Sequence, residues 1–241
     1  MRLLVTRPEP DASLEAEALT ARGHEPVLAP LLAIEFVRDV VVELAGAQAL
    51  IVTSRNALRA LASYRELEEA LRLPLYAVGE ATARAATKLG FRQVTEGPGM
   101  GAALAELIGG KLAPGAGSLV HLAGETLAFD LKSALQAEGF SVRQPVLYRA
   151  VPAGELPANA LSLLKAGRLD GVILMSPRTA KTFALLLDRH GLVTEGRRLV
   201  CYCLSEAVAE AVAPVGARVR VAAQPREEDV LALVDSEAAS S

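Results

Sequence analysis

Three segments of the sequence place hydroxyl or glycine residues where a strand is expected to end and a helix to begin. They are Thr53–Asn56, Val78–Thr82 and Met175–Thr179. Free N–H groups at a helix start attract anions, and the carboxyl ends of parallel strands form the binding crevice of open α/β sheets. The three segments together therefore predict sites for an anionic ligand. Each segment alone is also explained as an ordinary helix cap, with Ser176 as the N-cap and Pro177 as the first helical residue.

A glycine-rich segment, Gly97–Ala102, follows a predicted strand and opens a predicted helix. It satisfies a loose GxGxxA pattern of dinucleotide binding. A glycine-rich turn is the simpler interpretation, because the segment lies in the third strand-to-helix turn of its domain and no acidic residue ends the next strand, Leu119–Leu122. A dinucleotide-dependent reductase stays open as an alternative that requires measurable NAD(P) affinity.

The remaining chemistry-bearing residues do not form a motif of metal binding or hydrolysis. Cys201 and Cys203 lie two apart on a predicted strand and so share a face, which favours buried apolar thiols. The three histidines are far apart in sequence, so no metal site is predicted. Tyr148 is interpreted either as packing at a hinge or as a phenol that faces a ligand and donates a proton.

Short apolar runs alternate with segments of helical period along the whole chain. This rhythm predicts βαβ units, parallel sheets and helices on both faces. The apolar runs that we expect to form strands are Leu3–Thr6, Ala49–Thr53, Leu75–Val78, Val94–Thr95, Leu119–Leu122, Val172–Met175, Leu199–Leu204 and Val219–Val221.

The sequence contains an internal repeat. Val78–Ala83 lines up with Leu204–Ala209, 126 positions later, and the same offset pairs Gly90 with Gly216. The order of the repeated parts predicts a duplicated, five-stranded, doubly wound α/β domain. One copy is inserted into the other.

The expected domains are a discontinuous one, 1–33 and 150–241, and an inserted one, 37–146. Two crossing segments, 31–37 and 146–152, are expected to link them. Two such linkers are typical of a hinge beside a ligand-binding cleft. A two-lobed binding or sensor protein of the periplasmic-receptor type is therefore an alternative to an enzyme, although the N-terminus does not have the pattern of a signal peptide.

Composition limits the classes of partner. The 241 residues include 25 basic and 28 acidic ones, for a net charge of −3, with 51% hydrophobic residues. This balance argues against nucleic-acid binding, and no apolar run approaches the length of a membrane span. Two cysteines do not make a disulfide framework, so we expect a cytoplasmic protein, and we expect a monomer.

Five short motifs, in this order along the chain, resemble those of the uroporphyrinogen-III synthase family. They are Leu4–Pro8, Thr53–Ala57, Val78–Ala83, Leu147–Arg149 and Ser176–Thr179. The resemblance implies two flavodoxin-like domains joined by a two-stranded linker. One departure is the second copy of the VG-x-x-TA motif, which reads Ser-Glu-Ala-Val at positions 205–208.

The implied activity is the closure of hydroxymethylbilane with inversion of its ring D through a spirocyclic intermediate, in tetrapyrrole biosynthesis. No metal or organic cofactor is implied, and a transient hand-over of the bilane from hydroxymethylbilane synthase is expected. Tyr148 is the expected proton donor to the departing hydroxyl. The expected substrate-binding residues are Thr6, Arg7, Thr53, Ser54, Arg55, Asn56, Gly79, Thr82, Ser176, Arg178 and Ser205.

Overall fold

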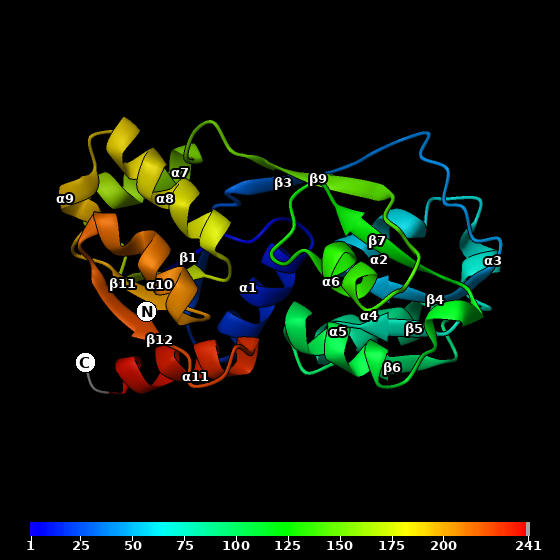
Figure 1. Cartoon of the computed structure of the whole chain (residues 1–241). Coiled ribbons are helices and arrows are strands. Elements are labelled where there is room, and N and C mark those ends of the chain that lie inside the picture. The colour runs from blue at the N-terminus through cyan, green and yellow to red at the C-terminus, as the bar shows by residue number, and fades with distance from the viewer. Residues whose placement is uncertain (240–241) are drawn as a thin grey trace. The chain divides into compact units, whose positions relative to one another are not determined.

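The computed structural model describes residues 1–239, and positions 240 and 241 of the predicted discontinuous domain lie outside the described residues. The described chain is a mixed α/β structure that divides into two compact units (Figure 1). The split unit consists of Met1–Ala33 and the chain from Val151 onward, and the continuous unit is Ile34–Ala150. No helix within residues 1–239 has the combination of length and apolar character that crossing a membrane requires.

The split unit is built on a parallel sheet. Within the described residues this sheet has five strands in the order β12-β11-β10-β1-β2. Its elements in chain order are β1 (Arg2–Val5), α1 (Asp11–Ala21), β2 (Glu25–Leu28), α7 (Ala158–Lys165), β10 (Gly171–Leu174), α8 (Pro177–Arg189), α9 (Val193–Gly196), β11 (Val200–Cys203), α10 (Glu206–Val212), the 3-10 helix η2 (Ala213–Val215), β12 (Arg218–Val221) and α11 (Glu227–Ala238).

The central strands of this sheet are apolar at nearly every position because helices cover both faces. Successive side chains alternate between the faces, so Leu4 packs with α7, α8 and α10, while Leu3 packs with α1 and α11. Cys201 and Cys203 are both fully buried and unpaired on the first of these faces, as predicted. Burial raises the pKa of both thiols to about 12, so they stay protonated.

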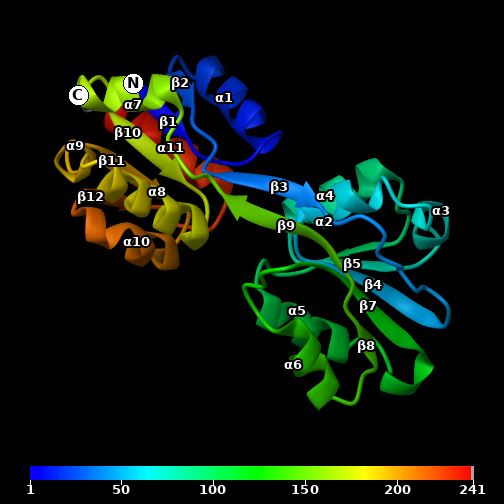
Figure 2. The ribbon, with the colours of Figure 1, turned by 90° about the horizontal axis from the view of Figure 1, so that it is seen from above.

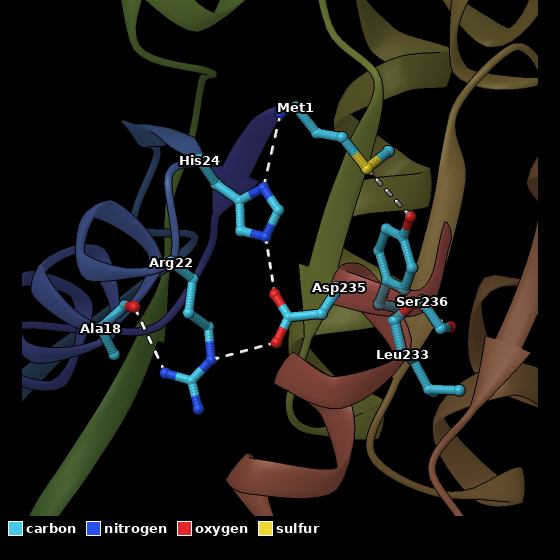
Figure 3. Close-up of polar contacts among 8 residues, drawn as sticks. Met1, Ala18, Arg22, His24, Leu233, Asp235 and Ser236 are labelled. Carbon is cyan, nitrogen blue, oxygen red and sulfur yellow. Dashed lines mark hydrogen bonds and ion pairs between the residues drawn. The ribbon is translucent and has the colours of Figure 1, made fainter. Parts of the chain in front are cut away.

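A polar cluster fastens the last helix, α11, to the start of the chain (Figure 3). The Asp235 carboxylate accepts a hydrogen bond of 2.9 Å from Nε2 of His24 and one of 3.3 Å from Nε of Arg22. Nδ1 of His24 in turn lies 3.5 Å from the amino group of Met1. The cluster joins α1, β1 and α11 on one face of the sheet.

The continuous unit is built on a second sheet, in which the described residues give the order β3-β9-β7-β4-β5-β6, with β8 beside β7. The strands β3 and β9 are the two segments in which the chain passes from one unit to the other. The elements are β3 (Leu32–Phe36), β4 (Ala47–Val52), α2 (Arg55–Leu61), α3 (Leu67–Ala70), β5 (Leu75–Ala77), α4 (Glu80–Leu89), β6 (Val94–Glu96), α5 (Gly101–Gly109), the 3-10 helix η1 (Pro114–Ala116), β7 (Ser118–Gly124), α6 (Leu131–Ala137), β8 (Val142–Arg143) and β9 (Val146–Pro152).

Helices cover both faces of this sheet too. Figure 2 shows α5 and α6 on one face and α2 and α4 on the other. Along β4, Ala49 and Ile51 pack under α5 and α6, whereas Leu50 and Val52 pack under α2 and α4. This alternation decides which residues at the end of β4 meet which loops.

The apolar runs identified in the sequence all form strands, each within a residue or two of the expected bounds. The repeat is visible in the backbone as well. Gly90 and Gly216 each end a helical segment in the left-handed region, with φ of 117° and 72°. Glycine adopts this conformation without steric cost, which explains its recurrence at the offset of 126.

Candidate active site

A pocket of about 560 Å³ opens at the carboxyl ends of the strands of the continuous unit. This is the edge at which ligands bind in open α/β sheets. The side chains come from the ends of β4, β5 and β7, the start of α5, the loop before α6, and β9. The lining residues are Thr53, Ser54, Val78, Gly99, Met100, Gly101, Ala102, Gly124, Thr126, Leu127, Ala128, Phe129, Leu131 and Tyr148.

Tyr148 reaches this pocket because its neighbour on the adjacent strand has no side chain. The β7–β9 register places Gly124 opposite Tyr148, with a bulge between Ala123 and Gly124. A Cβ atom at Gly124 would lie 2.6 Å from Cζ and 2.8 Å from the hydroxyl of Tyr148. Glycine at 124 therefore leaves the space that the phenol ring occupies.

The phenol of Tyr148 is held in its protonated form. Burial raises its pKa above the ordinary value of 10, and a hydrogen bond with the Ser54 side chain opposes this only in part. The structure thus brings together three of the predicted residues, Thr53, Ser54 and Tyr148, in one pocket. A neutral hydroxyl that can donate a proton is what the pocket offers at neutral pH.

Behind Thr53 lies a buried histidine that the sequence analysis did not assign to the site. Oγ1 of Thr53 is 3.3 Å from Nε2 of His121, and Nδ1 of His121 is 3.2 Å from Oε1 of Gln144. His121 is 1% exposed. Burial lowers its pKa from the ordinary value, although Gln144 and Asp130 oppose the shift, so the imidazole is neutral at neutral pH.

Two loops of the pocket were also missed as site segments, Gly99–Ala102 and Thr126–Phe129. The first is the glycine-rich turn, and its glycines allow close packing. A Cβ at Gly101 would lie 2.8 Å from Cβ of Phe129, and one at Gly79 would lie 3.2 Å from Cα of Gly99. The position of Gly97–Ala102 after a strand was the signal that could have placed this turn in the site.

The helix starts of the continuous unit form as predicted. Ser54 caps α2 and accepts a hydrogen bond of 3.2 Å from the N–H of Asn56. The Asn56 side chain accepts one of 2.7 Å from Nη1 of Arg59. Arg55 is the first residue of α2, Gly79 precedes α4, and Thr82 is buried in its first turn. Gly79, Thr82, Arg55 and Asn56 are not among the residues that line the pocket.

The predicted residues of the split unit lie at the carboxyl ends of its own strands. Ser176 follows β10 and caps α8, accepting a hydrogen bond of 3.1 Å from the N–H of Thr179. Arg178 is a partly buried residue in the first turn of α8, and Ser205 precedes α10. The hydroxyl of Thr6, in contrast, is fully buried and donates a hydrogen bond of 2.6 Å to the carbonyl of Ile173.

Arg7 is surrounded by carboxylates. Its Nη1 atom is 2.6 Å from Glu227 and 3.7 Å from Glu15, and its Nη2 atom is 3.6 Å from Asp11. Burial alone would lower the pKa of Arg7, but these carboxylates raise it above its ordinary value. The guanidinium therefore joins the loop after β1 to α1 and α11.

Glu15 is the unusual member of this cluster. It is fully buried, and neither of its carboxylate oxygens has a hydrogen-bond partner among the described residues. Burial raises the pKa of Glu15 to about 7; Arg7 opposes this shift, while Glu227 and Asp11 add to it. Glu15 therefore changes its charge near neutral pH.

We expect the stability of the protein to fall between about pH 5 and pH 8 because of Glu15. The carboxyl group of Glu15 binds its proton more tightly in the folded protein than in the unfolded chain, where its pKa is near 4.5. The protonated group therefore stabilises the fold fully below pH 4.5, and this stabilisation is lost as the pH rises through about 7. The full effect is about 3 kcal/mol. Chemical denaturation of the wild type and of Glu15→Gln as a function of pH measures the difference. Glu17→Gln, an exposed change on the same helix, is the control. An equally pH-dependent Glu15→Gln variant would contradict this assignment.

A second hollow in the continuous unit, of about 840 Å³, lies beside Phe36–Val41 and Ser63–Glu66. It contains none of the predicted residues and includes no residue from the carboxyl ends of β4, β5 or β7, so the smaller pocket is the better candidate site. Within residues 1–239, no group of His, Cys, Asp and Glu side chains is arranged to hold a metal ion.

Comparisons with known proteins agree with this architecture. A family model described as uroporphyrinogen-III synthase HemD matches residues 14–232. A solved uroporphyrinogen-III synthetase from Helicobacter pylori superposes with a TM-score of 0.64 at 20% identity, over 98% of each chain. A mutant uroporphyrinogen III synthase from the extremely thermophilic bacterium Thermus thermophilus gives a TM-score of 0.62 at 22% identity, over 100% of this chain and 99% of that one.

At these identities the solved structures establish the shared fold. No curated protein sequence gives a match. The family model is the stronger finding because it covers most of the sequence. Neither the family model nor the two solved structures support the alternative of a two-lobed receptor. On this evidence, the chain belongs to the uroporphyrinogen-III synthase family.

Proposed function

We propose that this protein closes hydroxymethylbilane to uroporphyrinogen III with inversion of ring D, and that as a lyase it releases water in doing so. The family assignment supports the reaction. The observation that supports it is the half-buried phenol of Tyr148, which lies in a pocket at the strand ends and is held in its protonated form. No cofactor is needed in this proposal, because the pyrrole rings supply the electrons for each bond that forms.

The first step is the loss of the hydroxyl group from ring A. Tyr148 donates a proton to this group, which leaves as water, and the ring nitrogen pushes electrons to give an electrophilic azafulvene. Positioned acid catalysis of this kind contributes typically 10²- to 10⁴-fold. The raised pKa of Tyr148 supports this role because it keeps the phenol protonated at neutral pH.

The second step needs positioning more than chemistry. The substituted carbon of ring D attacks the azafulvene and forms the spirocyclic intermediate. The bond from that carbon to the methylene of ring C then breaks and leaves a second azafulvene on ring C. The free carbon of ring D attacks this methylene and closes the macrocycle, and the proton that this carbon loses restores the phenol of Tyr148. Holding ring D turned over is enough to select this route, since orientation alone lowers barriers by several kcal/mol. The apolar part of the pocket, Leu127, Phe129 and Met100, fits the face of a pyrrole.

The carboxylates of the bilane need donors, and helix starts supply them. In the continuous unit, α5 begins at Gly101 inside the pocket, and no side chain of the described residues caps it. Carboxylate-binding roles are also proposed for Ser54, Arg55, Asn56, Gly79 and Thr82 there, and Thr53 is proposed to contact another group of the substrate. In the split unit they are proposed for Thr6, Arg7, Ser176, Arg178 and Ser205. For Thr6 and Arg7 the proposed role acts through the backbone of their loop, since both side chains have protein partners.

The two units fit a duplicated pair of flavodoxin-like domains, with boundaries at 1–33 and 150–241 and at 37–146, linked by 31–37 and 146–152. The strand order β2-β1-β10-β11-β12 supports this proposal for the split unit. We further propose a cytoplasmic monomer that receives the bilane from hydroxymethylbilane synthase. The two unpaired cysteines support a reducing compartment.

Ser176→Ala is expected to weaken substrate binding more than folding. The loss of a helix N-cap costs about 0.5–2 kcal/mol of stability, which a domain of this size tolerates. Steady-state kinetics and thermal denaturation separate the two effects, and Ser176→Thr, which keeps a capping hydroxyl, is the matched control. A less stable Ser176→Ala variant with an unchanged KM would limit Ser176 to capping α8.

The proposed activity is tested by incubating the protein with freshly generated hydroxymethylbilane. The products are oxidised, and porphyrin isomers I and III are separated by chromatography. We expect isomer III with the protein and isomer I from spontaneous closure in buffer. Isomer I alone in both samples would refute the proposed function. Tight binding of a sugar or an amino acid in a parallel calorimetric titration would then favour a receptor.

A further inference from the structure

Three side chains from separate strands of the continuous unit form a hydrogen-bonded row that ends in the pocket. Thr53 follows β4, His121 lies in β7, and Gln144 follows β8. The registers explain the row, because β4 pairs Ile51 with His121, and β8 pairs Arg143 with Val120, so that the next residue, Gln144, continues beside His121. Only Thr53 of the three lines the pocket.

The row has a direction that its chemistry determines. Oε1 of Gln144 is an amide oxygen and can only accept, so Nδ1 of the 3.2 Å contact must carry the proton. A neutral imidazole has one N–H, which leaves Nε2 as an acceptor. The hydroxyl of Thr53 must then donate its proton to Nε2 across 3.3 Å. Because the hydroxyl proton of Thr53 is used in the hydrogen bond to His121, Oγ1 of Thr53 can only accept a hydrogen bond from a ligand in the pocket.

We propose that His121 and Gln144 are positioning residues that make Thr53 a hydrogen-bond acceptor for a pyrrole N–H of the substrate. This inference rests on the proposed function for the identity of the ligand. It goes further than the proposed function because it distinguishes hydrogen-bond donors from a hydrogen-bond acceptor within the site. The helix starts donate to carboxylates, while Thr53 accepts from a ring N–H and disfavours a carboxylate at its own position.

This division bears on ring orientation. A pyrrole has a single N–H, so an acceptor at a fixed point determines which edge of the ring faces the protein. A hydroxyl free to rotate would donate or accept, and so would accommodate a carboxylate at the same point. The histidine removes that freedom. The row therefore supplies specificity without contacting the substrate beyond Thr53.

The direction of the row can be measured without turnover. In protein labelled with ¹⁵N-histidine, nitrogen chemical shifts report which ring nitrogen carries the proton, and only three histidines, His24, His121 and His190, need assignment. We expect His121 to be neutral and protonated at Nδ1. Gln144→Met, which keeps the chain length and removes the acceptor, should abolish this preference. A wild-type His121 protonated at Nε2 would overturn the inference, because Thr53 would then be free to donate.

Kinetics test the use of the acceptor. Thr53→Val keeps the volume and should raise KM for the bilane and lower kcat/KM by about three- to tenfold, the usual effect of one hydrogen bond. Thr53→Ser restores the hydroxyl and should recover most of the loss, while thermal denaturation shows that both variants fold. Gln144→Met should increase the share of isomer I. A Thr53→Val variant with the same kinetic constants and the same isomer ratio as the wild type would refute the inference, even if the wild type makes isomer III. Absence of isomer III from the wild type would instead refute the proposed function and leave the measured tautomer unaffected.

Discussion

Replacing Tyr148 by phenylalanine is expected to lower the rate of isomer III formation by about 100- to 10,000-fold, the usual contribution of one positioned acid. The substitution keeps the ring beside Gly124 and removes only the hydroxyl, which the structure places in a pocket with Ser54. Folding should change little, because one lost hydrogen bond costs about 1 kcal/mol. The rate of isomer III formation, measured under single-turnover conditions, checks the prediction.

The product mixture gives an independent readout of the same variant. Spontaneous closure does not depend on the protein, so isomer I should rise as the enzyme slows. Binding of the finished macrocycle should survive, since its carboxylates are expected to bind at helix starts rather than at the phenol. A Tyr148→Phe protein that makes isomer III at the parent rate would show that the phenol is packing and that water or a substrate carboxylate supplies the proton.

Replacing Gly124 by alanine is expected to lower the rate of isomer III formation by about 100-fold. The new Cβ would lie 2.6 Å from Cζ of Tyr148, a distance that forces the ring to move. A displacement of about 1 Å at a reacting group is enough for a loss of this size. The backbone at 124 is extended strand, so alanine itself introduces no conformational strain there.

The cost of Gly124→Ala should fall on activity more than on folding. Overpacking a close contact destabilises by about 1–3 kcal/mol, and thermal denaturation measures this part. Gly115→Ala, where a Cβ meets no atom within 4 Å, is the matched control in the same unit. The combination of Gly124→Ala with Tyr148→Phe should cost little more than Tyr148→Phe alone, since both act through one hydroxyl. Additive losses would contradict a role of Gly124 in placing the phenol.

Local sequence signals were sufficient for much of this architecture. The apolar runs predict the strands because each is buried between helix layers and is therefore apolar at nearly every position. Ser176 was recognised as an N-cap, and Thr53–Asn56 as a possible cap segment, because an N-cap depends only on the next three residues. The burial of Cys201 and Cys203 on one face of the sheet was predicted because side chains two apart along a strand point to the same face.

The parts that sequence reasoning missed depend on neighbours across the sheet. The space that Gly124 leaves for Tyr148 depends on the β7–β9 register and on a bulge, which no local pattern specifies. His121 contacts Thr53 although the two residues are 68 positions apart in the sequence. No local pattern therefore distinguishes His121 from any other buried residue of a strand. The sequence motif around Arg7 likewise gives no sign of Glu227, 220 positions away, which binds the same guanidinium.

Isotopic labelling tests directly whether this protein breaks and remakes a bond to ring D. Hydroxymethylbilane is prepared with ¹³C at the methylene between rings C and D and at the ring D carbon that bears it. These two atoms are bonded in the substrate and give a one-bond ¹³C–¹³C coupling. The proposed route breaks this bond in the spirocyclic intermediate and attaches the methylene to the other side of ring D. We predict that the product formed by the protein has lost the one-bond coupling; a cyclised product that retains it would contradict the account.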